Sequence, residues 1–101
     1  MSISSETSND GQNVTIAIAG QFDFNVVQEF RNAYMNIGDG AADVTLDMRE
    51  TEYMDSSALG MLLNMKKHLG VADHCIRIVN CRPQVKKILD ISRFDKKFQI
   101  D

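Results

Sequence analysis

Apolar residues recur at every second position in several short segments, the spacing typical of strands with one face on a core. Residues 14–20 alternate large apolar with small side chains, and residues 44–48 and 76–79 alternate in the same way. Residues 3–7 alternate more weakly and join the next segment through the turn Asn9-Asp10-Gly11. The pattern therefore predicts an N-terminal hairpin followed by two further core strands.

Other segments place apolar residues three and four positions apart, which predicts helices. The first runs over residues 26–36, with Asn25 as its N-cap, Gln28 at the capping-box position and Gly38 after its end. The acidic stretch 49–52 then connects the second core strand to the next helix.

The second helix begins after Asp55 and extends to His68 or Leu69, where Gly70 ends it. Pro83 at a first-turn position starts the third helix, which turns inward Val85, Ile88 and Leu89. Residues 94–100 can add one short edge strand. Because helices and strands alternate behind the hairpin, we expect an α/β sandwich in which α-helices pack on a mixed sheet.

Length and composition indicate one compact domain spanning residues 1–101, since 101 residues with 44% hydrophobic content suit a single core. The chain has no apolar run near the roughly 20 residues of a membrane span, and no basic and then apolar leader. We expect a cytoplasmic protein without a membrane partner. The net charge of −3, with lysine pairs scattered among acids, makes nucleic acid an improbable partner.

The two cysteines, Cys75 and Cys81, flank a predicted strand. At 3.3 Å per residue they lie about 20 Å apart, far beyond disulfide reach. Without a CxxC motif or a second ligand pair, they are interpreted as structural thiols of a reducing compartment.

The most informative segment is Met54-Asp55-Ser56-Ser57-Ala58-Leu59-Gly60, where a strand pattern gives way to a helix. A helix start carries unpaired N–H groups and a partial positive charge, so it can hold a phosphorylated side chain. On a helical wheel the core side holds Leu59, Leu62, Leu63 and Leu69, and the opposite stripe holds Ser57, Gly60, Met61, Asn64 and His68. The wheel thus selects Ser57 over Ser56 for contact with a partner.

Alternatives remain open at this junction. One interpretation is that the polar residues Asp55, Ser56 and Ser57 only cap the helix, and the other is that they form a protein-binding site. Met61 is an interface residue or a spare core residue, and Asp23 is a turn aspartate or lies beside Asp55.

A catalytic serine is disfavoured, because the nucleophile-elbow motif is missing and His68 lies about 16 Å along the helix from Ser57. The sequence also lacks a phosphate-binding loop and a calcium loop, so we expect neither enzymatic activity nor a cofactor or metal.

The hairpin, residues 20–24, the Asp55-Ser56-Ser57 motif and residues 80–89 together resemble the STAS domain, specifically the single-domain anti-anti-sigma factors. The resemblance implies that Ser57 is phosphorylated by an anti-sigma factor that is itself an ATP-dependent serine kinase, and that a PP2C-type phosphatase reverses this. The unphosphorylated form then binds the anti-sigma factor. Asp23 matches an acidic residue near the phosphorylation site in such proteins.

One position departs from the family pattern: Ala58 replaces the usual glycine, adding a methyl group near the surface that a kinase would cover.

We expect phosphorylation at Ser57 and a partner-binding set of Asp23, Asp55, Ser56, Ser57, Ala58, Gly60, Met61 and Asn64. The alternative function is a constitutive STAS scaffold or complex subunit, in a motility or biofilm signalling branch or a transport complex, with Ser57 as a helix cap.

Overall fold

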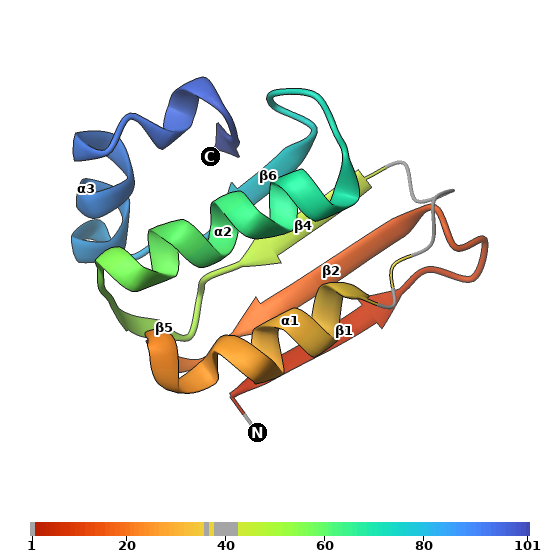
Figure 1. Cartoon of the computed structure of the whole chain (residues 1–101), viewed down its shortest axis with the longest axis horizontal. Coiled ribbons are helices and arrows are strands. Elements are labelled where there is room, and N and C mark those ends of the chain that lie inside the picture. Colours follow the sequence, from red (N-terminus) through yellow and green to blue (C-terminus); the bar gives the residue numbers. More distant parts are fainter. Residues whose placement is uncertain (1, 36, 38–42) are drawn as a thin grey trace.

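The main sheet of the protein is mixed, as predicted (Figure 1). The computed structural model describes residues 2–35, 37 and 43–101. Within them, five strands follow the order β1-β2-β4-β6-β7. Strand β1 runs antiparallel to β2, and the remaining neighbours are parallel. The strands are β1 (Ile3–Thr7), β2 (Asn13–Ile18), β4 (Asp43–Asp47), β6 (Ile76–Val79) and β7 (Gln99–Ile100).

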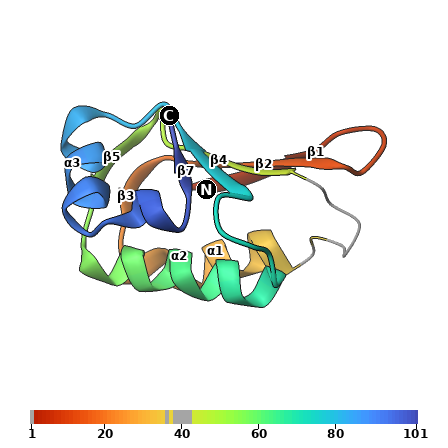
Figure 2. The ribbon, with the colours of Figure 1, turned by 90° about the horizontal axis from the view of Figure 1, so that it is seen from above.

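Helices α1 (Val27–Met35) and α2 (Ser56–Leu69) lie side by side on one face of this sheet (Figures 1 and 2). Helix α3 (Pro83–Ile91) packs at the end of the sheet, against strand β5 (Thr51–Met54). The core fills the space between the layers, because alternate strand residues and one stripe of each helix point into it. Its fully buried members include Ile16, Ile18, Phe22, Phe30, Leu46, Met54, Leu62, Ile78 and Leu89.

A second, two-stranded sheet was not predicted. It pairs β3 (Gly20–Phe22) with β5 in parallel, so the segment 49–52 is not merely a connection. Gly20 makes the bend from β2 into β3 at φ +75°, a conformation that suits glycine. The buried Thr51 hydroxyl donates a 2.7 Å hydrogen bond to the carbonyl of Ile18, which ties the small sheet to the large one.

The start of the first helix differs from the prediction. Asp23 caps a short 3-10 helix (Phe24–Val26) that leads into α1, and its Oδ1 accepts the N–H of Asn25 at 3.0 Å. Asn25 as N-cap, with Gln28 completing a capping box, is therefore wrong. The aspartate two residues earlier is the cap, and its side chain accepts the N–H of Asn25 itself. The predicted helix end at Asn36 and Gly38 lies outside the described residues.

Helix α2 has the predicted limits, with Asp55 before it and Gly70 closing it at φ 65°. Its buried stripe is rotated from the prediction, however, and consists of Ala58, Met61, Leu62 and Met65. Met61 is only 5% exposed, whereas Leu63 is 38% exposed. The reason is that α1 covers the flank that holds Met61, and a wheel of one helix cannot show its neighbour.

The third helix and the tail follow the prediction. Val85 and Leu89 are buried, Ile88 packs at the edge of the core, and β7 adds the short edge strand parallel to β6.

Cys75 is an exposed free thiol, and Cys81 is a half-buried free thiol whose pKa is raised to about 11 by burial.

Candidate functional site

Two aspartates end the neighbouring strands of the small sheet. Phe22 in β3 pairs with Met54 in β5, and each is followed directly by an aspartate, Asp23 and Asp55. The parallel pairing therefore brings both carboxylates to the same edge of the sheet, where each caps a helix. The hypothesis that Asp23 lies beside the Asp55 junction when the two strands are neighbours is confirmed.

The Asp55 carboxylate organises the start of α2. Its Oδ1 accepts the N–H groups of Ser57 at 3.0 Å and Ala58 at 3.2 Å, and the Ser57 hydroxyl donates to the same oxygen at 2.6 Å. The Ser57 hydroxyl, together with these two N–H groups, holds the pKa of Asp55 below its usual value. Asp55 is thus an ionised N-cap, and Ser57 is held by it.

The two serines differ in their surroundings. Ser56 is exposed and Ser57 is half-buried. Ala58, by contrast, is fully buried, so its methyl group packs into the core and does not reach a visiting protein. The expectation that Ala58 lies near a surface covered by a kinase is wrong, because α2 turns this position toward the sheet.

Further along α2, Gly60 and Asn64 are exposed on successive turns. A Cβ atom built on Gly60 would meet nothing within 4 Å. The domain's own packing therefore does not require glycine at this position. Met61 was predicted to share this exposed stripe, but it is a core residue, so a direct partner contact through its side chain is contradicted by its burial.

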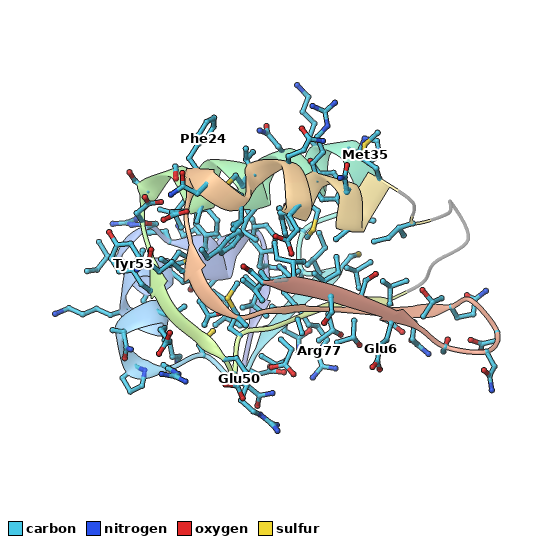
Figure 3. All side chains as sticks on the ribbon, turned by 90° about the horizontal axis from the view of Figure 1, so that it is seen from below. Glu6, Phe24, Met35, Glu50, Tyr53 and Arg77 are labelled. Atoms are coloured by element: carbon cyan, nitrogen blue, oxygen red, sulfur yellow. The ribbon has the colours of Figure 1, made fainter. Side chains whose placement is uncertain are left out.

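Two exposed aromatic residues flank the junction and were missed by the sequence analysis. Phe24 is 68% exposed and Tyr53 is 51% exposed. Figure 3 shows both at the same end of the molecule, directed away from the core. The sequence offered no period-two signal for Tyr53, because β5 does not alternate: Thr51 and Met54 are buried, whereas both residues between them are exposed. Large exposed aromatics beside a polar centre are typical of protein-binding surfaces.

The two histidine rings make their contacts with residues outside the junction. The His68 ring packs on Tyr34 with 5.4 Å between ring centroids, and the His74 ring lies 2.8 Å from the carbonyl of Asp95. In the described part of the chain, no three His, Cys, Asp or Glu side chains gather as metal ligands would. The same residues include no helix with the length and apolarity that a membrane crossing requires.

Comparison with known proteins places this arrangement in a family. The family model described as "Mlab, STAS domain" matches residues 5–100. A STAS-domain containing protein of Pseudomonas aeruginosa (strain UCBPP-PA14) is 45% identical over 100 residues, which cover 99% of this chain and 99% of the relative.

Solved structures show the same fold at low sequence identity. An anti-sigma factor antagonist from Mycobacterium paratuberculosis superposes with a TM-score of 0.79 at 18% identity, covering 98% of this chain and 85% of that one. The Bacillus cell fate determinant SpoIIAA in its phosphorylated form superposes with a TM-score of 0.71 at 18% identity, covering 98% and 90%. The family model and the close relative both span almost the entire sequence, and this chain belongs to the STAS-domain family.

Proposed function

We propose that this protein is an anti-sigma factor antagonist whose binding to its partner is controlled by phosphorylation of Ser57. The observation that carries the proposal is the start of α2, where the Ser57 hydroxyl meets an ionised Asp55 at a partly exposed edge that also holds Asp23. The partner is an anti-sigma factor with ATP-dependent serine kinase activity, and a PP2C-type phosphatase restores the unmodified serine. The structural neighbour described as an anti-sigma factor antagonist supports the choice of partner, and the neighbour solved in a phosphorylated form supports control by phosphorylation.

A phosphoryl group on Ser57 would change binding more than folding. It adds about −1.5 to −2 charges at a helix start, where the helix dipole favours anions by roughly 0.3–1 kcal/mol. The Asp55 carboxylate already accepts the N–H groups of residues 57 and 58, so two anions would compete for the same donors. A partner that covers this edge must desolvate both charges, at a cost of several kcal/mol. We expect binding to weaken by about a hundredfold or more.

The surface around Ser57 fits such a partner. Phe24 follows Asp23 and Tyr53 lies two residues before Asp55, and both supply exposed aromatic area. Gly60, one turn along α2, leaves space for a close approach, since an added Cβ would meet no described atom within 4 Å. In the described part of the chain the Ser57 hydroxyl bonds to the ionised Asp55 cap, and we assign the domain binding and no catalysis.

A second candidate is a constitutive STAS scaffold or complex subunit. It is favoured by one observation, the 2.6 Å hydrogen bond that makes Ser57 part of the α2 cap without any modification. In this case replacing Ser57 changes helix stability and leaves partner binding unchanged.

The deciding experiment combines phosphorylation mapping with binding. The protein is incubated with the purified anti-sigma kinase and ATP, and phosphopeptides are mapped by mass spectrometry. We expect modification of Ser57 and none in Ser57→Ala, while Ser56→Ala serves as the matched control and is modified normally. Calorimetry should then show that Ser57→Ala binds the kinase constitutively and that Ser57→Asp binds at least partly more weakly.

Two results contradict the switch. One is phosphorylation of Ser56 while Ser57 stays unmodified. The other is equal affinity of the phosphorylated and unmodified proteins for the kinase, which would support the scaffold function.

A further inference from the structure

The groove between α1 and α2 has the size of a small-molecule site. The two helices lie side by side on the sheet (Figures 1 and 2). A cavity of 500 Å³ opens between them. Small-molecule pockets in proteins occupy roughly 300–1,000 Å³. Ser57 and Asp55 do not line this groove, although Met61 and Asn64 of the predicted partner-binding set do.

The floor of the groove is apolar and closed. Phe30 and Tyr34 of α1 and Met61 of α2 line it, and each is 6% exposed or less. Val27 lines one end, and Met35, which is 44% exposed, stands at the mouth. The apolar body of a ligand would therefore lie between the helices, against the more exposed Val27 and Met35 and above a floor that the core already holds in place.

Among the residues that the structure describes, the charged side chains on the rim of the groove are basic. Arg31 of α1 and Lys67 and His68 of α2 line it, and no described lining residue is an aspartate or glutamate, although the whole chain has a net charge of −3. Neither Arg31 nor Lys67 forms an ion pair within the described residues. Lys67 and His68 lie in the last turn of α2, where the helix dipole favours cations. The helix dipole does not explain the position of Arg31, because Arg31 lies in the middle of α1.

Polarity also changes along the groove. The helices run in the same direction (Figure 1), and the Tyr34 and His68 rings meet near their C-terminal ends. Val27 and Met61 precede these two residues by two helical turns each, about 10 Å. The end of the groove at Val27 and Met61 is thus apolar, and the other end carries Lys67 and His68 together with Met35.

The geometry points to a binding site for a small amphipathic organic anion in the α1–α2 groove. Its carboxylate or sulfonate head lies against Arg31, Lys67 and His68, and its apolar body extends about 10 Å toward Met61. A protein helix suits the groove less well. Packed helices lie about 8–10 Å apart and a helix is about 10–12 Å wide, so a third helix would rest on the rim above the floor.

Dodecanoate is a suitable probe, because it combines one carboxylate with a narrow apolar chain. Titration into the full chain is followed by backbone amide chemical shifts. We expect saturable shifts confined to α1 and to α2 from Met61 to His68. Dodecyltrimethylammonium has the same chain with a cationic head, and it should bind about tenfold more weakly or worse.

Charge reversal tests the basic rim. Arg31→Glu/Lys67→Glu changes two exposed residues of the groove, and we expect about a tenfold or greater loss of dodecanoate affinity. Lys86→Glu/Lys87→Glu makes the same change in charge on exposed α3 positions outside the groove, and it should bind like the unmodified chain. Thermal melting checks that both variants fold.

Three outcomes overturn the proposal. They are shifts that do not map to the groove, equal affinity for the cationic and anionic probes, and equal loss of affinity in the two charge-reversed variants. Each can be distinguished from a failure of the Ser57 switch, because none depends on a kinase or on phosphorylation.

Discussion

The Ser57 hydroxyl donates a 2.6 Å hydrogen bond to Oδ1 of Asp55, the oxygen that also accepts the N–H groups of Ser57 and Ala58. One carboxylate oxygen therefore serves both the helix cap and the proposed phosphorylation site. Phosphorylation of the hydroxyl removes one donor from this oxygen and puts a second anion beside it.

The ionisation of Asp55 should depend on Ser57. The hydroxyl is the largest cause of the lowered Asp55 pKa, so Ser57→Ala should raise this pKa toward its usual value. Titration of the side-chain carboxyl signal by NMR measures it. Asp101 is the internal control, because its pKa is lowered by Arg77 at a separate site and should not move.

The sign of the effect on stability follows from the same shift. A lowered pKa means that the folded state binds the proton more weakly than the unfolded chain does, so the interaction stabilises the fold above the unfolded pKa of about 3.9. It is lost as the pH falls through the folded-state pKa. The stability difference between the unmodified protein and Ser57→Ala should shrink on acidification, and an unchanged Asp55 midpoint in Ser57→Ala would contradict this account.

Met61 and Leu63 test the orientation of α2. Met61→Ala should lower the free energy of unfolding by about 2–5 kcal/mol, because it leaves a cavity under a residue that is 5% exposed. Leu63→Ala, at a position that is 38% exposed, should cost less than about 1 kcal/mol. Urea denaturation of both variants provides the comparison. The reverse ranking would restore the predicted wheel.

Gly60 should be replaceable within the domain but not within the complex. Gly60→Ala should raise the free energy of unfolding by up to about 1 kcal/mol, since alanine favours a helix and its Cβ meets nothing. Affinity for the anti-sigma kinase should fall in the same variant, because the methyl group occupies the contact surface. Calorimetric melting and titration separate the two effects, and unchanged affinity would remove Gly60 from the interface.

Phe24 and Tyr53 should contribute to partner binding without contributing to stability. Each exposed ring, replaced by alanine, should lower affinity for the kinase by about tenfold while unfolding changes by less than about 0.5 kcal/mol. Ile91→Ala is the matched control, since Ile91 is 71% exposed and is the last residue of α3. A loss of affinity as large in the control would show that exposed apolar area in general, and not this edge, governs binding.

The sequence alone determined which segments form the principal elements. The alternation in β2, β4 and β6 and the caps of α2 are local features, in which neighbouring residues set both the period and the ends. The Asp55-Ser56-Ser57 motif was likewise identified from local features, because a strand pattern stops there and a capped helix begins.

Only the tertiary structure decided what depends on contacts between distant segments. The pairing of β3 with β5 brings Asp23 beside Asp55 across more than thirty residues, and no local pattern specifies the partner of so short a strand. The burial of Met61 and Ala58 follows from where α1 and the sheet lie around α2. A helix has one sequence but several possible neighbours, and packing against these neighbours determines which of its side chains meet solvent.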